Sequence, residues 1–459
     1  MSKTDLTQGS IKQAIRNLAI PSSIGFLFNT LFNVVDTYFA GQLNVAALAG
    51  LTVSFPLFLI MIALASGIGN GATAIAAIAL GKKDHVDYLR IAKNSLIISL
   101  GLAIGLVLLA PFAIPSLLSI AGATGDTYEA ALAYMNVIIY GGLFQILNFT
   151  FNGLLSAQGD TKPFRNFLII GFFLNIFLDP LFIFGWFGLP ALGTAGVAWA
   201  TVVVQALGTL YLGYAWMKST LFNAATFNEV RFNRITAGLL VKQGVPVALN
   251  NATISIGIFI IQFFIYRFGN DETLAGYGAA IRIEQVFLIP TIGLNIATVA
   301  IVGQNYGAKL FDRIETTIKQ ALKYALILLS VGLIVIWPFA PLLVSAFNSD
   351  PDVIAEGALY LRIEGLALFS YSFIGIGSST LQAIKKPYYA LLIGILRQLS
   401  PLLVFFVLGE VLQLGIQGVW WGIVIINYTA VVLVWLIVST MLKQLKSPKI
   451  NMEETSYAK

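Results

Sequence analysis

Two aspartates, Asp36 and Asp179, stand inside strongly apolar runs, FNTLFNVVDTYFAG and NIFLDPLFIF. A carboxylate at the depth of a bilayer core costs about 2.5–3.5 kcal/mol to insert, so such residues usually serve ions, protons or substrates. Loss of water favours the neutral form of a carboxyl group, which makes reversible proton binding the chemistry expected here. Neither run contains a basic residue that would neutralise its aspartate.

Polar residues near the aspartates recur at helical spacing. Asn29, Asn33 and Asp36 fall at i, i+4 and i+7 on one helix face, and Asn175 and Asp179 are spaced i, i+4. Two further stripes are formed by Gln145, Asn148 and Asn152 and by Thr201 with Gln205. Four polar faces in one half of the chain predict a hydrated, substrate-binding chamber. The alternative for the uncharged residues is a set of hydrogen bonds that join helices.

The composition predicts an all-α, polytopic membrane protein. The chain has 459 residues, of which 58% are hydrophobic and only 10% charged. It has no cysteine and one histidine, His85 in a charged loop, so we expect no disulfide, metal site or cofactor and no histidine-based catalysis within the membrane. The net charge of +6 is spread over alternate loops rather than over one patch, which argues against nucleic-acid binding.

Twelve apolar segments are each long enough to cross a bilayer core of about 30 Å. Lysine and arginine are concentrated in every second loop, for example at Lys82 and Lys83, and the intervening loops have almost none. This bias predicts that both termini are cytoplasmic. The predicted spans are 14–40, 46–80, 91–118, 128–157, 164–186, 193–217, 240–268, 273–306, 315–345, 353–382, 387–409 and 415–442.

The second half of the chain repeats the first. At an offset of 226 residues, Gly67 corresponds to Gly293 and Lys83 to Lys309, and the sequence LGTAGVAW returns later as LGIQGVWW. Two six-helix lobes of the same orientation would be related by a pseudo-twofold axis along the membrane normal. The predicted divisions are an N-terminal lobe 1–217, a cytoplasmic linker 218–239, a C-terminal lobe 240–445 and a cytoplasmic tail 446–459.

The halves differ at the acidic positions. Gln262 stands where Asp36 stands in the first half, and Ser400 corresponds to Asp179, so a carboxylate is not needed to build the lobe. Glu284 is a candidate for a second site, although a structural role is the main expectation for it. Pro21, in the same span as Asp36, is a candidate hinge because a proline removes a helix hydrogen bond.

These residues carry a resemblance to a known family. Pro-x14-Asp in the first span, Asn-x3-Asp-Pro in the fifth and GDTKP at 159–163 resemble the multidrug and toxic compound extrusion (MATE) family, over essentially the whole chain. Confinement of the deepest acids to the N-terminal half is similar to its DinF-like branch. In the Na⁺-linked NorM-like branch, acids also occupy the interior of the seventh and tenth spans.

The resemblance implies a proton-coupled antiporter that exports drugs and dyes, often cations, by alternating access, with Na⁺ as the other candidate ion. It assigns proton coupling to Asp36 together with Asn175, Asp179 and Thr201. We expect a monomer in the inner membrane of a bacterium or archaeon, and not an enzyme.

Two alternatives remain from the sequence. A flippase for a lipid-linked precursor would need several cationic residues in the cleft, and few are present. An intramembrane aspartyl protease would need its two aspartates to share a proton at close range. The YD and GxGD contexts typical of such proteases are replaced here by VVD and FLD.

Overall fold

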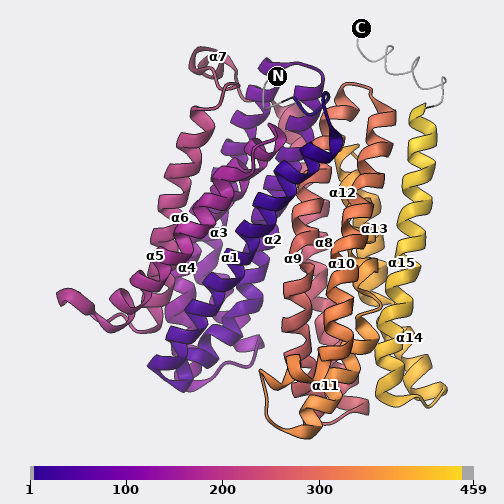
Figure 1. Ribbon diagram of the computed structural model, residues 1–459. Helices are drawn as coiled ribbons and strands as arrows, with labels where there is room; N and C mark the ends of the chain where they lie inside the picture. The colour runs from indigo at the N-terminus through magenta and orange to yellow at the C-terminus, as the bar shows by residue number, and fades with distance from the viewer. Residues whose placement is uncertain (1–4, 447–459) are drawn as a thin grey trace. The chain divides into compact units, whose positions relative to one another are not determined.

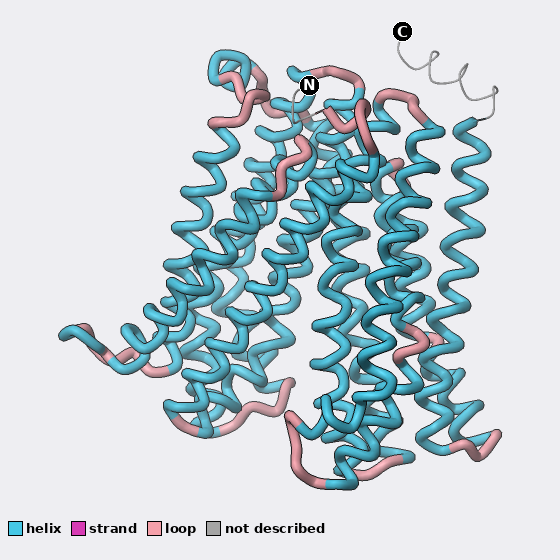
Figure 2. The backbone as a smooth tube through the Cα atoms, viewed as in Figure 1, coloured by secondary structure: helices cyan, strands magenta, loops and turns pink. Residues whose placement is uncertain are grey.

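The computed structural model describes residues 5–446, and within that range every regular element is a helix (Figure 2). Eleven of these helices are long and apolar enough to cross a membrane, and a bent pair brings the number to twelve when counted as one span. The predicted all-α, twelve-span class is thus confirmed. Large apolar side chains such as Leu108, Phe112 and Ile334 are exposed on the helix surfaces, as expected for helices that face lipid. The predicted tail lies, after Lys446, outside the described residues.

The first compact unit consists mainly of Pro21–Leu249. Helix α4 lies at its centre and packs against α2, α3 and α6, while α5 packs against α6. In Figure 1, α7 lies at one end of this unit and the connection between α5 and α6 at the other. The helices are α1 (Ile11–Leu43), α2 (Val45–Gly81), α3 (His85–Ile120), α4 (Gly125–Ala157), α5 (Lys162–Phe184), the 3-10 turn η1 (Trp186–Gly188), α6 (Thr194–Met217) and α7 (Ala224–Glu229).

The second unit combines Leu6–Ile20 with the residues from Asn250 onward. Here α9 is central and packs against α10, α11 and α12, and α15 packs against α12 and α13. The helices are α8 (Arg234–Phe268), α9 (Asp271–Gly307), α10 (Phe311–Ser345), α11 (Pro351–Glu364), α12 (Leu368–Ala383), α13 (Pro387–Leu399), α14 (Pro401–Phe405), the π-helical turn η2 (Phe406–Val411) and α15 (Gly415–Lys446).

The internal repeat is visible in one helix crossing. A Cβ atom added to Gly50 of α2 would lie 2.9 Å from the backbone nitrogen of Ala131 of α4. At the corresponding positions of the second unit, a Cβ added to Gly276 of α9 would lie 2.6 Å from the backbone nitrogen of Gly357 of α11. Small residues let helix backbones approach closely, which replaces the hydrophobic driving force that lipid removes.

The two compact units begin later in the chain than the predicted lobes. Residues 6–20, which include the part of α1 before Pro21, group with the second unit, whereas α8 begins at Arg234 and stays with the first unit up to Leu249. Hydrogen bonds hold the leading segment: the Leu6 amide donates to Gln304 over 2.8 Å, and Asn305 donates to the Leu6 carbonyl over 3.2 Å. Long-range contacts of this kind cannot be read from hydropathy.

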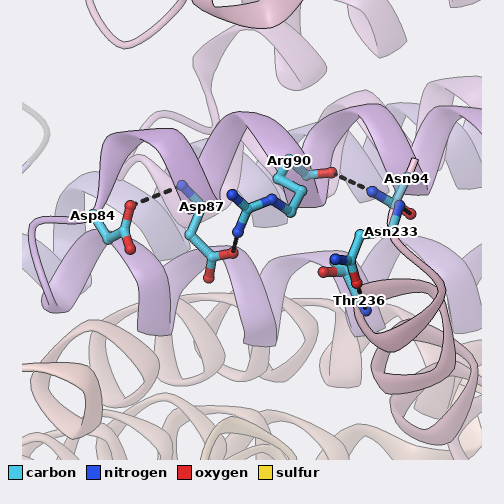
Figure 3. Close-up of polar contacts among 6 residues, drawn as sticks. All are labelled: Asp84, Asp87, Arg90, Asn94, Asn233 and Thr236. Carbon is cyan, nitrogen blue, oxygen red and sulfur yellow. Dashed lines mark hydrogen bonds and ion pairs between the residues drawn. The ribbon is translucent and has the colours of Figure 1, made fainter. Parts of the chain in front are cut away.

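The polar end of α3 holds the segment that leads into α8 (Figure 3). Asp84 caps α3 by accepting a hydrogen bond from the Asp87 amide over 2.8 Å. Two turns further on, the Asn94 side chain donates to the Arg90 carbonyl and accepts from the Asn233 amide over 3.1 Å. The start of α8 is therefore fixed to α3 by side-chain hydrogen bonds, within a stretch predicted to be only a linker.

Two predicted spans are interrupted. The span predicted at 353–382 consists of α11 and α12, bent by 48° at a short break that contains Gly365. The span predicted at 387–409 changes at Ser400 into α14 and then into a π-helical turn. Pro401 explains the second interruption, because its ring nitrogen cannot donate the helix hydrogen bond. The sequence did not predict either interruption, because both spans are apolar throughout.

Candidate proton and substrate site

Asp36 of α1 and Asp179 of α5 are joined by one side-chain amide. Asn175, one turn before Asp179, donates from Nδ2 to Asp36 Oδ1 over 3.0 Å and to Asp179 Oδ1 over 3.1 Å. The three side chains are almost fully buried, with exposed fractions of 8% for Asp36 and 0% for the other two. The predicted i, i+4 stripe of α5 thus faces the predicted stripe of α1.

Thr201 of α6 completes the group of four predicted coupling residues. Its hydroxyl lies 3.4 Å from Asp36 Oδ2 and 3.2 Å from the Val197 carbonyl oxygen one turn earlier. Because the carbonyl is closer, the bond to Asp36 is the weaker of the two. Thr201 thus lies at the site and contacts Asp36 Oδ2, whereas Asn175 donates to Asp36 Oδ1.

The charge of this group is not balanced within the described part of the chain. No lysine, arginine or histidine nitrogen lies within 4.0 Å of either aspartate among residues 5–446. Asp179 Oδ2 and Asn175 Oδ1 are buried and have no hydrogen-bond partner there. Two buried carboxylates at close range cannot both remain ionised at moderate cost. The arrangement is suited to holding a proton, and its open oxygens are also suitable ligands for a small cation.

Tyr134 of α4 is a buried titratable side chain that the sequence analysis did not select. It is 7% exposed and interacts electrostatically with both Asp36 and Asp179. Tyr134 precedes Gln145 by eleven residues, which is close to three helical turns, so it lies on the polar face already recognised in α4. Extension of that stripe toward the start of the helix would have identified it.

The predicted chamber residues do not form one hydrogen-bonded set. Asn148 donates to Gln205 Oε1 over 2.7 Å and accepts from Thr209 over 2.9 Å, which links α4 to α6. This is also the geometry expected if these residues serve to join helices. Asn152 accepts from Ser156 of the next turn, and Gln145 is buried on the same face of α4.

The remaining predicted residues lie along α1. Asn33 is exposed and donates to the Asn29 carbonyl over 3.1 Å, and Asn29 is half-buried. Pro21 lies within α1, at the residue where the helix passes from the second contact unit to the first. Asn29 and Asn33 therefore share a helix face with Asp36 without bonding to it directly.

Comparisons with known proteins cover both halves of the chain. A family model described as MatE matches residues 21–181 and 246–408. The probable multidrug resistance protein NorM of Thermotoga maritima is 27% identical over 421 residues, which cover 90% of this chain and 89% of that protein. An FAD transporter of Shewanella oneidensis is 26% identical over 423 residues, or 92% and 93% of the two chains.

Solved structures agree with these sequence matches. A MOP superfamily transporter from Pyrococcus furiosus superposes with a TM-score of 0.90 at 28% identity, over 97% of this chain and 99% of that one. The similarity therefore extends over the whole helical fold, including the helices that carry Asp36, Asn175 and Asp179.

Proposed function

Because the chain belongs to the MatE family, whose members are membrane transporters and not enzymes, we propose that it is a proton-coupled exporter of lipophilic organic compounds. The observation that carries this proposal is the Asp36–Asn175–Asp179 group. A buried pair of carboxyl groups without a cationic partner binds and releases protons, and it attracts an organic cation when it is ionised.

In the proposed cycle, Asp36 and Asp179 are ionised when substrate enters from the cytoplasmic side. Protons from the outer side then neutralise them, which lowers the affinity for a cation and releases it outward. The Asn175 amide contacts both carboxyl groups, so protonation of one changes the hydrogen bonding of the other. Alternating access exposes the site to one side of the membrane at a time.

The polar faces of α1, α4 and α6 supply the proposed substrate chamber. Asn29 and Asn33 lie on the face of α1 that carries Asp36, and their amides keep that face hydrated. The α4 and α6 residues Gln145, Asn148, Asn152 and Gln205 would orient polar groups of the substrate. Pro21 is the proposed hinge of α1, because its missing N–H weakens the helix at one position.

Na⁺ is the alternative coupling ion. The unpartnered oxygens of Asn175 and Asp179, with the Thr201 hydroxyl nearby, are the ligand types that a hard cation selects. The substrate class also has two candidates, because one relative is named for multidrug resistance and another for FAD. The family assignment gives no support to a lipid flippase, and it excludes the protease.

For the location, we propose the cytoplasmic membrane of a prokaryote, with a monomer as the working unit. The loops that carry Lys82, Lys83, Lys162 and Arg165 lie at the same end of the first unit, since each follows an even number of its spans. The positive-inside rule places that end in the cytoplasm.

The test is substrate-driven proton movement in proteoliposomes. An imposed ethidium gradient should change the lumenal pH with the parent protein, to the same extent with and without Na⁺. Asp36→Asn and Asp179→Asn should lose this exchange, while Asp126→Asn, at an exposed position at the start of α4, should retain it. Exchange by Asp36→Asn at the parent rate would overturn the proposal. A strict requirement for Na⁺ would show that Na⁺, and not the proton, is the coupling ion. FAD, added as a competitor of ethidium, tests whether the protein binds an anionic substrate.

A further inference from the structure

A second pair of buried carboxyl groups lies in the other unit. Glu284 of α9 and Glu364, the last residue of α11, are 6% and 1% exposed. Tyr360 donates its hydroxyl hydrogen to Glu284 Oε2 over 3.2 Å, and Tyr371 donates to Glu364 Oε1 over 2.7 Å. Tyr360 and Glu364 are four residues apart on one face of α11, so the Tyr360 bond brings Glu284 to the face that carries Glu364.

Among residues 5–446, one cationic group acts on this pair. The Arg397 guanidinium of α13 lies 5.0 Å from the centre of the Tyr371 ring and attracts both carboxylates. It forms no ion pair within 4.0 Å with either acid among the described residues. The other titratable groups that interact with the pair are the phenols of Tyr277, Tyr360 and Tyr371, and of Tyr428 toward Glu364.

The charges of this cluster balance with one proton added. Two carboxylates and one guanidinium leave one net negative charge in a site that is closed to water. Glu364 Oε2 is buried and has no hydrogen-bond partner in residues 5–446, and a protonated carboxyl tolerates such a position far better than an ionised one.

The position of Glu364 in its helix also favours the protonated form of its carboxyl group. Glu364 ends α11, and α12 begins at Leu368 after a bend of 48°. The C-terminal end of a helix carries partial negative charge, which disfavours an ionised carboxylate there. Figure 1 labels α11 near one end of the second unit and α12 toward the other.

Two tyrosine side chains hold the break between α11 and α12. Tyr371, in the first turn of α12, spans it by bonding to Glu364, and Tyr428 of α15 donates to the Leu366 carbonyl over 2.7 Å. Interrupted helices at membrane depth are the usual location of ion sites in transporters. A change of charge on Glu364 acts directly on the contact that joins the two halves of this span.

We propose that Glu284 and Glu364 form a second proton-exchanging site, in which the two carboxyl groups share one proton at the break between α11 and α12. Proton binding by this pair is independent of Asp36. Its contribution to transport rests on the proposed function, since it would add one proton to each exchange.

Infrared difference spectroscopy of reconstituted protein tests the shared proton. With Asp36→Asn and Asp179→Asn as background, pH titration should show the C=O stretch of one protonated carboxyl group. Glu284→Gln and Glu364→Gln should each abolish it, because the remaining carboxylate is then balanced by Arg397. Glu410→Gln, at an exposed ion pair with Arg267, is the matched control and should leave the band unchanged.

Sharing is what distinguishes the pair from two separate acids. Retention of the band in either single glutamine variant would overturn the shared proton, and absence of the band from the background protein would overturn the site. Arg397→Gln provides a second readout: with the cation removed, the band should grow toward two protonated carboxyls, and an unchanged band would contradict the charge balance. Size-exclusion profiles in detergent identify variants that fail to fold.

Proton-to-ethidium stoichiometry then separates the two proposals. Glu364→Gln should lower the number of protons exchanged per ethidium while transport continues. An unchanged stoichiometry would overturn the role in transport. Normal exchange by Asp36→Asn would overturn the proposed function, and the infrared result would stand.

Discussion

The side-chain nitrogen of Asn175 donates a hydrogen bond to Asp36 Oδ1 over 3.0 Å, although the two residues are 139 positions apart in the chain. The same nitrogen also reaches Asp179, so a single amide contacts both buried aspartates of the first unit. The amide supplies donors to a buried acidic pair without adding a positive charge. Because the amide adds no charge, the negative charge of the pair can be neutralised by an exchangeable ion.

Asn175→Leu should reduce both stability and exchange. The substitution removes the side-chain amide that donates to both buried carboxyl groups, and an unsatisfied buried polar group costs about 1–3 kcal/mol. We expect a lower unfolding temperature in detergent and loss of ethidium-driven proton movement. Asn228→Leu, at an exposed position of α7, is the control and should change neither. Parent-like stability and exchange in Asn175→Leu would show that the amide is dispensable.

Thr201→Val should have a smaller effect than Asn175→Leu. The Thr201 hydroxyl is closer to the Val197 carbonyl, at 3.2 Å, than to Asp36, at 3.4 Å. Loss of so weak a bond should cost less than about 1 kcal/mol, so exchange should slow but persist. Thr201→Ser keeps the hydroxyl and should exchange at the parent rate. Complete loss of transport in Thr201→Val would instead make this hydroxyl a direct ligand of the coupling ion.

Lys83→Gly should stabilise the protein by about 0.5–1 kcal/mol. Lys83 follows α2 with φ of 61°, in the left-handed region that favours glycine, and the Asp84 amide closes the turn by donating to the Ala79 carbonyl. Thermal unfolding in detergent measures the gain. Lys82→Gly removes the same charge at an ordinary φ of −74°, so it should not stabilise. Equal shifts in the two variants would mean that charge, and not backbone strain, governs the effect.

Gly153→Ala should destabilise the first unit. A Cβ atom at Gly153 of α4 would lie 2.2 Å from the Gly69 carbonyl oxygen of α2, so the two helices must separate. Overpacking of this kind typically costs about 1–3 kcal/mol. Gly101→Ala in α3 meets nothing within 4 Å and should gain up to about 1 kcal/mol from helix propensity. A neutral Gly153→Ala, measured by thermal unfolding, would contradict the close approach.

Membrane spans and acidic positions were predictable because they depend on local sequence. Only a helix satisfies its own backbone in lipid, so long apolar runs had to become spans, and their number agrees with the structure. Asp36 and Asp179 were identified because a carboxylate in such a run is costly wherever the helix lies. The family match agrees with the resemblance carried by these residues, although it does not distinguish the DinF-like branch.

Partners across helices were not predictable, because helical periodicity gives the face of a residue but not its neighbour. Tyr134 interacts electrostatically with Asp36 and Asp179 because of the packing around α4. Glu284 and Glu364 each lie two residues after an arginine in the sequence, Arg282 and Arg362. In the structure Glu284 accepts a hydrogen bond from Tyr360 of α11 and Glu364 accepts one from Tyr371 of α12, with the Arg397 guanidinium of α13 over the Tyr371 ring.

By itself, the sequence determined that this chain crosses a membrane about twelve times, repeats itself, and has two acids that lipid alone would exclude. The tertiary structure decided which side chains meet: Asn175 between two aspartates, and Tyr360 and Tyr371 on two glutamates at a broken helix. The physical reason is that insertion into a bilayer is governed by local apolar content, whereas charge balance within it is governed by contacts between helices distant in the chain.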